Sequence, residues 1–437
     1  MKKYSFGAAV AAGLLAGGLS VGTAQAADLG GNCCADLEER IAELEATTVR
    51  KGNRKVSLTI SGWVAEQLTW WDDGTESNVY VTGVGVTLAS HFKLTGAAQI
   101  TPGWSAGYVI HVETGSGDPT VVDQSDDDGG GPGVSLLQSY WFLKSDSLGK
   151  VSVGQLSHAS DNTAILVDGS GSLVPANWVL FDGTSFRLRS GGNFVNNYTW
   201  GDIAACGHTS LGIAADCNGI PLNAVRYDSP TFGGFSVSAS WGEDDFWDVA
   251  ARYAGEFAGF KLAVAAAYSQ NNDESSFPEL NFVRRDSGYF QVGAYLQHVP
   301  TGLFVYGAYG HENNDNFSPD PEGNGNGDEI QQGDNDHWYV KAGIRQRWTP
   351  LGHTVLYGEY ANHDDMTSQY LLDRQDANNS ASSELRRWGV GVVQEIDAAA
   401  MSIWLAYRNM DGEFKIDGTK TELDELHIVK FGALINF

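Results

Sequence analysis

Eight lysines and arginines lie in stretches where apolar and polar residues alternate, each on the polar side of its stretch. They are Lys93, Arg226, Arg252, Lys261, Lys341, Arg345, Arg347 and Arg408. A long intervening segment carries further charges at Asp161, Asp168, Asp182, Arg187 and Arg189. Acids and bases that face each other across a narrow aqueous space create an electric field that selects ions and orients dipolar solutes. We predict this arrangement here; alternatively, individual charges only solvate a wall or pair with each other away from the narrowest point.

Signals for covalent or metal chemistry are weaker. Ser157 and His158 are adjacent, but nothing nearby completes a nucleophilic relay. The ten histidines show no metal-ligand spacing, and the acidic stretch DNFSPDPEGNGNGDE lacks the spacing of a calcium loop. The cluster Asp126 to Asp128 either binds divalent cations that bridge lipopolysaccharide or forms a solvated loop tip. We predict no metal site, no cofactor and no enzymatic activity.

The four cysteines fall into two pairs. Cys206 and Cys217 lie eleven residues apart within the long segment. In an exported chain such a pair is expected to form a disulfide, which would stabilise the segment by about 2–3 kcal/mol. Cys33 and Cys34 are adjacent, and two alternatives stay open for them: bonds between chains of an oligomer, or free thiols.

Alternating stretches of this kind are typical of strands with one apolar face. In FSVSASW, residues 235–241, serine separates the apolar residues. In WYVKAGIRQRW, residues 338–348, three basic residues oppose a set that begins and ends with tryptophan. The final stretch, LDELHIVKFGALINF, alternates up to Phe437. So much charge on one face, with aromatics at the ends of the other, favours a membrane β-barrel over a soluble sandwich.

The N-terminal residues have the pattern of a secretion signal. Lys2 and Lys3 precede the apolar run AAVAAGLLAGGLSV and the small-x-small site Ala24-Gln25-Ala26. We predict a leader over residues 1–26, after which no run of eighteen apolar residues remains for a membrane helix. Loss of two lysines leaves 25 of the 27 basic residues against 54 acidic ones. Such an acidic chain is a poor candidate for nucleic-acid binding.

Short turns allow the strands to be counted. Seven are tight and carry Pro, Gly or small polar residues, as hairpins require, at residues 101–104, 146–149, 229–234, 254–259, 299–302, 349–352 and 395–399. Seven hairpins plus one strand at each end predict about sixteen antiparallel strands, with both chain ends on the periplasmic side. The other connections are long and polar, and we assign them to the outer surface: 72–83, 115–133, 270–284, 313–334, 364–384 and 411–424.

The longest connection runs from about His158 to Leu222 and contains the apolar patches AILV and VPANWVLF. Loops of this length are usually functional or disordered, and a barrel of this size has a lumen to fill. We therefore predict that the first half of this segment folds inward and narrows the lumen.

Residues 27–55 are predicted to be a periplasmic segment that precedes a barrel over 56–437. Within it, DLEERIAELEA places Leu37, Ile41 and Leu44 on one helix face. This short helix either packs with the same helix of two other chains in a three-helix bundle or lies frayed beneath the barrel. The basic patch over residues 50–55 is positioned to meet either lipid phosphates or the peptidoglycan side.

Three stretches resemble the general porins of alphaproteobacteria: residues 33–64, VGQLSHASDNTAI at 153–165, and NAVRYDSPTFGGFSVSASWGEDDFWDVAARYAGEF at 223–257. The resemblance covers essentially the whole mature chain. It implies a homotrimeric, sixteen-stranded porin of the bacterial outer membrane, embedded in lipid and lipopolysaccharide. It also implies passive diffusion of small hydrophilic solutes and ions past an inward third extracellular loop.

Two other functions remain alternatives. A substrate-specific channel, for example for sugars, would need an aromatic slide, for which Trp141, Trp178 and Trp404 are the candidates. An outer-membrane enzyme or an adhesin is the third possibility. Ion selectivity is set by opposing terms, because the net acidity favours cations whereas the predicted wall is basic. We expect a weak preference for cations.

Overall fold

The computed structural model describes residues 56–437 except 86, 116, 128–132, 177–180, 207–216, 244, 273–285, 316, 320–328, 332, 368–380 and 417. The predicted leader, the helix around Leu37 to Leu44, and Cys33 and Cys34 lie outside the described residues. Within the described part of the chain, no helix is long and apolar enough to cross a membrane.

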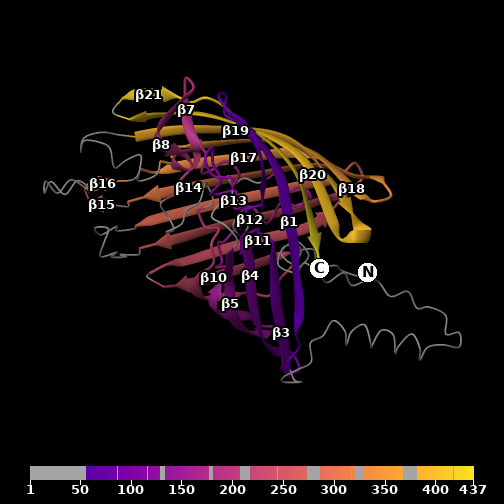
Figure 1. Cartoon of the computed structure of the whole chain (residues 1–437). Helices are drawn as coiled ribbons and strands as arrows, with labels where there is room; N and C mark the ends of the chain where they lie inside the picture. Colours follow the sequence, from indigo (N-terminus) through magenta and orange to yellow (C-terminus); the bar gives the residue numbers. More distant parts are fainter. Residues whose placement is uncertain are drawn as a thin grey trace.

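Sixteen antiparallel strands of the described residues close into a barrel (Figure 1). Each pairs with the next in the chain, and the circle closes where β1 pairs with β22 from Trp63 opposite Asn436 to Asp72 opposite His427. The strands are β1 (Thr59–Asp72), β3 (His91–Thr101), β4 (Trp104–Gly115), β5 (Gly133–Ser145), β6 (Gly149–Leu156), β9 (Leu222–Asp228), β10 (Phe235–Gly242), β11 (Trp247–Phe257), β12 (Phe260–Asn271), β13 (Ser287–His298), β14 (Leu303–Asn314), β17 (Asn335–Thr349), β18 (Gly352–Asp364), β19 (Ala381–Ile396), β20 (Met401–Ile416) and β22 (Leu426–Asn436). The predicted strand number is confirmed.

All seven predicted tight turns join neighbouring wall strands. The connection between β11 and β12 shows why the sequence turns there. Ala258 and Gly259 both have positive φ, 48° and 81°. Two such residues form the hairpin turn whose twist matches that of the flanking strands. We call the end of the barrel that carries these connections the short-turn end, and the opposite end the long-loop end.

Three of the predicted long loops, 72–83, 313–334 and 411–424, contain short strands of their own. β2 (Ser77–Thr82) pairs with the long-loop end of β1, and β21 (Thr419–Glu422) pairs with β20. The polar residues that flank these short strands hid their pairing, although β2 itself alternates, with Tyr80 buried and Val79 and Val81 exposed. The remaining short elements are β7 (Arg187–Ser190), β8 (Asn193–Thr199), β15 (Phe317–Pro319), β16 (Glu329–Gln331), and the 3-10 turns η1 (Trp200–Ile203) and η2 (Asp397–Ala399).

The outer face of the wall carries the predicted apolar set. Along β17, Trp338, Val340 and Trp348 are exposed while the intervening Lys341 is fully buried. Aromatic rings gather at one level on adjacent strands, as in the pairs Trp338 with Tyr360 and Trp388 with Tyr407. From Trp338 to Trp348 a strand rises about 33 Å, or about 25 Å across a membrane at a typical barrel tilt. That height matches the apolar band of outer-membrane barrels.

Residues 157–221 lie between β6 and β9, and we call them the long segment. Its apolar side chains share clusters with the inner face of the wall. Phe186, Leu188 and Trp200 pack with Met410 and Ile428 from β20 and β22. These contacts hold β7, β8 and η1 against one side of the barrel interior.

Candidate functional site

The long segment begins at an acid on the wall. Asp248 of β11 accepts hydrogen bonds from Nδ1 of His158, at 2.6 Å, and from the backbone nitrogen and hydroxyl of Ser160, at 2.6 and 2.7 Å. It also accepts from the hydroxyl of Ser240 on β10. All four side chains are buried. A single carboxylate with this many donors fixes the start of the segment against two strands.

Two predicted wall arginines donate hydrogen bonds to backbone carbonyls of the same turn. Arg226 donates to the carbonyls of Ser157 and His158 at 2.7 and 3.0 Å. Arg252 donates to the carbonyl of Ala159 at 2.5 Å and to the hydroxyl of Thr163 at 2.9 Å. These guanidinium groups therefore orient the segment as well as bringing positive charge to the inner wall.

A buried ion pair holds the next stretch of the segment. Lys341 of β17 donates to Asp168 at 2.5 Å and to the hydroxyl of Ser172 at 2.9 Å. The ammonium of Lys341 also lies 5.8 and 5.7 Å from the ring centres of Tyr306 and Tyr357. Both charges of the pair are out of solvent, so each depends on the other for compensation.

A second buried cluster surrounds Asp182. Lys430 of β22 and Arg408 of β20 donate to one of its oxygens at 2.5 and 2.9 Å, and Gln67 of β1 donates to the other at 3.2 Å. Burial acts to raise the pKa of Asp182, but the two cations outweigh it and hold the pKa below its ordinary value. Arg408 also pairs with Glu359 at 3.3 Å. Asp182 is thus an ionised anchor at mid-height of the wall.

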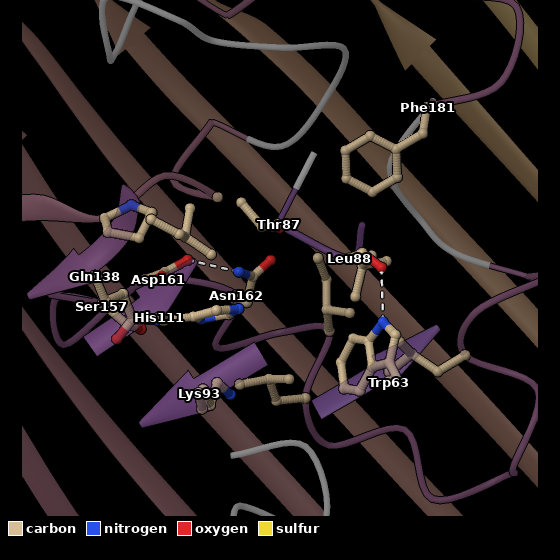
Figure 2. Close-up of a pocket in the computed structure, with 16 residues that line it drawn as sticks. Trp63, Thr87, Leu88, Lys93, His111, Gln138, Ser157, Asp161, Asn162 and Phe181 are labelled. Atoms are coloured by element: carbon tan, nitrogen blue, oxygen red, sulfur yellow. Dashed lines mark hydrogen bonds between the residues drawn. The ribbon is translucent and has the colours of Figure 1, made fainter. Parts of the chain in front are cut away.

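Two cavities meet at the beginning of the long segment. One, of about 700 Å³, is lined by Lys93 and His111 from the wall (Figure 2). The other, of about 2120 Å³, is lined by Arg226 and Arg252 and reaches the turns of the short-turn end. The residues common to both linings are Ser157, Asp161 and Leu166.

Asp161 is the acid at this junction. Its carboxylate accepts a hydrogen bond from Asn162 at 2.6 Å and, unlike Asp168 and Asp182, makes no ion pair with Lys or Arg within 4 Å among the described residues. Burial raises its pKa, an effect that His158 and Arg226 oppose. A partly uncompensated acid here faces cavities with basic walls.

The other predicted charges lie toward the barrel ends. Arg345 pairs with Glu395 at 2.8 Å and Arg347 pairs with Asp397, both at the short-turn end. Lys261, the second residue of β12, is at the same end. In contrast, Arg189 pairs with Asp73 at 2.6 Å and with Glu76, and Arg187 donates to Ser125 at 3.1 Å. This second group lies at the long-loop end rather than beside Asp161.

Sequence reasoning missed several inner charges, Lys430, Glu359 and the buried Arg387, and it placed Asp248 on the inner face without predicting its role. Each occupies a polar position of an alternating stretch, so the signal was available for the wall as a set. Nothing in the sequence indicated which of these residues would contact the long segment, because those contacts join residues up to 255 positions apart.

The predicted disulfide between Cys206 and Cys217 is present. The two described candidates for the aromatic slide of the alternative channel lie on opposite faces of the wall. Trp141 is half exposed on the outer face of β5, and Trp404 is buried against Gly432 on the inner face of β20. Trp178 lies outside the described residues. The alternation around Trp141 shifts because β5 has an irregular register opposite His111 and Val112.

The profile of the Gram-negative porin family matches residues 8–432 of this chain. A search of curated proteins found no match. Among solved structures, the anion-selective porin from Comamonas acidovorans is similar at 15% identity, with 87% of this chain and 100% of that chain covered and a TM-score of 0.56. The outer membrane channel DcaP of Acinetobacter baumannii is similar at 12% identity, with 89% and 99% covered and a TM-score of 0.51. At such identities these two likenesses show a shared fold.

Proposed function

Given that the chain belongs to the Gram-negative porin family, we propose that its long segment narrows a diffusion channel at Asp161. The family and the closed barrel make the protein a channel for passive diffusion of small hydrophilic solutes across the bacterial outer membrane. The proposal concerns where the channel is narrowest and which charges act there.

One observation carries this proposal: the two cavities share only the short lining around Asp161. A solute that moves between them passes this acid while Lys93 lies on one side and Arg252 on the other. Opposed charges within a Debye length of about 8 Å create a transverse field at physiological salt. The segment would thus act as the inward loop that the sequence predicted, with its acid toward a basic wall.

Asp168 and Asp182 have a different role in this proposal. Their carboxylates are neutralised by Lys341, Lys430 and Arg408, and they are buried. They anchor the segment instead of contributing a free charge to the passage. Arg345, Arg347 and Lys261 line the vestibule at the short-turn end, and Arg187 and Arg189 line the opposite entrance.

The assembly is proposed to be a homotrimer in contact with outer-membrane lipid and lipopolysaccharide. The resemblance of residues 33–64, 153–165 and 223–257 to general porins of alphaproteobacteria supports both the subfamily and the trimer. The exposed apolar outer face agrees with a lipid environment. Cross-linking in detergent would report the number of chains.

Planar-bilayer recording of the purified protein tests the proposed function. We expect stepwise insertion of channels in groups of three, with currents that rise linearly with salt and are not blocked by sugars. Saturation or block by one sugar would instead support a substrate-specific channel, and absence of conductance in correctly folded protein would refute the diffusion channel.

The position of the narrowest point is tested separately by accessibility. A cysteine introduced as Leu166→Cys in a Cys33→Ser/Cys34→Ser background should react with a small thiosulfonate and lower the conductance by more than half. Glu395→Cys at the short-turn end is the matched control and should change it little. Equal effects at both positions would contradict a constriction at the long segment.

A further inference from the structure

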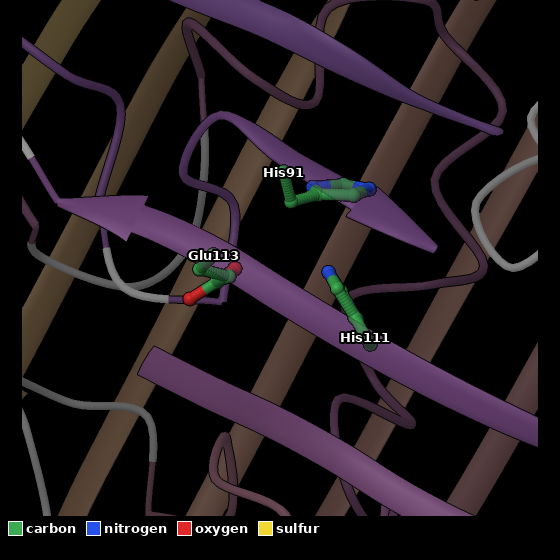
Figure 3. Close-up of side chains that lie close together, drawn as sticks. All are labelled: His91, His111 and Glu113. Carbon is green, nitrogen blue, oxygen red and sulfur yellow. The ribbon is translucent and has the colours of Figure 1, made fainter. Parts of the chain in front are cut away.

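Two histidines and a glutamate meet on the inner face of β3 and β4, where they are not part of any ion pair described above (Figure 3). His111 and Glu113 are two apart on β4 and therefore share one face of the strand. His91, at the start of β3, is the register partner of Glu113. One ligand atom from each of the three residues lies within 4.8 Å of the other two, and all three side chains are buried.

Each member of this trio has an atom that lacks a partner. Both ring nitrogens of His111 are buried without a hydrogen bond, and so is Oε1 of Glu113. His91 uses only Nδ1, which donates to the carbonyl of Ala89 at 2.9 Å and so leaves the lone pair of Nε2 available. Burying an unsatisfied polar group costs about 1–3 kcal/mol, so the unsatisfied atoms of His111 and Glu113 beside His91 favour a bound ligand.

We propose that His91, His111 and Glu113 bind a divalent transition-metal ion, with Zn²⁺ the best match. Two imidazoles and one carboxylate are the donor set of many zinc sites that keep a fourth position open. Around a tetrahedral ion the donor atoms lie about 3.4 Å apart, so the three side chains need to close by up to about 1.4 Å. Small side-chain rotations suffice for that.

The surroundings already orient the trio. The backbone nitrogen of Thr87 donates to Oε2 of Glu113 at 3.2 Å, so that Oε1 is left for the ion. The edge of Trp63 contacts His91 with ring centres 4.0 Å apart, and Trp63 is itself held by the carbonyl of Leu88 at 3.0 Å. Such outer contacts fix the ring orientation that metal binding requires.

The ion can reach this site from the channel. His111 lines the cavity that Lys93 also lines, and Glu113 lines a third cavity together with Glu66 and Ser90. Lys93, the register partner of His111, disfavours metal binding, because its ammonium interacts with Glu113 and repels a cation. Replacing Lys93 is therefore expected to strengthen metal binding.

Cobalt binding tests the proposal on the full-length, chelator-treated protein. A Cys33→Ser/Cys34→Ser background removes the thiols outside the described residues. We expect one Co²⁺ per chain with the intense ligand-field absorption of a four-coordinate ion, displaced by Zn²⁺. His111→Ala and His91→Ala should each weaken the affinity at least about 100-fold, and Lys93→Gln should increase it severalfold.

His353→Ala is the matched control, because this histidine is half-exposed beside Glu395 at the short-turn end. It should leave stoichiometry and affinity unchanged. His111→Gln, which retains size and hydrogen-bonding capacity, guards against misfolding of the alanine variant and should lose the ion too. Absence of saturable binding, or binding that survives both histidine variants, would overturn the metal site while leaving the channel function intact.

Discussion

At the scale of single residues, burial and pairing decide which charges act on a solute. Asp168, Asp182 and Asp161 all come from the long segment, and all are buried. Only the first two make short ion pairs with wall cations. In the proposed function, the same residue type therefore serves as an anchor in one place and as a source of the electric field in another.

Asp161→Asn should lower the preference for K⁺ over Cl⁻ about twofold at neutral pH. This is the change expected when one charge is removed about 8 Å from a solvated ion. Because burial raises the pKa of Asp161, the wild-type preference should decline as pH falls, before ordinary aspartates with pKa near 3.8 are neutralised. The variant should lack this step. Reversal potentials measured across a salt gradient at several pH values check it, and identical pH profiles would contradict the prediction.

The same raised pKa has a consequence for stability. A group whose pKa is higher in the folded state stabilises the fold below its unfolded pKa, and this contribution is lost as pH rises through the folded value. Asp161→Asn should therefore raise the unfolding midpoint at neutral pH. The difference from wild type should vanish in acid, and a lower midpoint at neutral pH would count against the assigned burial penalty.

At the scale of elements, the long segment depends on contacts with strands that are distant in the chain. Asp248 holds its start, Lys341 its next stretch, and Lys430 with Arg408 the region of Asp182. These partners lie on β11, β17, β22 and β20, around much of the barrel. A segment fixed on several sides would give the proposed constriction a constant width.

Asp168→Asn tests one of these anchors. It leaves Lys341 buried without its counterion, which should destabilise the fold by about 3–5 kcal/mol and increase current noise in single-channel records. Asp397→Asn, which breaks the half-exposed pair with Arg347, is the control and should cost at most about 1 kcal/mol. Denaturant unfolding measures both.

A double variant separates the charge from the shape of this anchor. Asp168→Leu with Lys341→Met removes both charges, so it should recover most of the lost stability. If it is no more stable than Asp168→Asn alone, the ion pair is not the source of the loss.

Cys206→Ser with Cys217→Ser tests the covalent link of the same segment. In the chain-entropy model, closing a loop of this length stabilises the folded state by about 3 kcal/mol, and most of this stabilisation applies to the loop itself. Limited proteolysis should then cut the segment much faster while the barrel strands stay protected. Equal cleavage rates in oxidised wild type and variant would show that other contacts already hold this region.

At the scale of the whole molecule, an apolar exterior and a charged interior belong to the same strands. The exposed set between the aromatic levels of β17 spans the height of a bilayer core, while Lys341 lies on the opposite face of that strand. A closed barrel also pairs every strand edge, which lipid demands of any spanning structure.

Leu405→Arg places a charge on this outer face, where Leu405 is half exposed. In folding into lipid vesicles it should cost about 2–4 kcal/mol, whereas Leu148→Arg, in an exposed turn at the short-turn end, should cost at most about 1 kcal/mol. Equal costs for the two variants would argue against Leu405 facing hydrocarbon.

The sequence by itself determined the wall. Alternation at Phe235 to Trp241 and Trp338 to Trp348, together with seven short turns, is local information, and it was sufficient for the fold class and the strand number. The hairpins β1–β2 and β20–β21 were missed because β2 and β21 are only six and four residues long and are flanked by polar residues.

Only the tertiary structure decided which inner residues meet. The contact between Asp182 and Lys430 and the convergence of His91 with His111 and Glu113 depend on register and on the path of the long segment. Neither is encoded by spacing along the chain, since a strand pattern specifies the face of a side chain but not its neighbour across the barrel. The physical reason is that faces follow from local geometry, whereas partners follow from closure of the whole sheet.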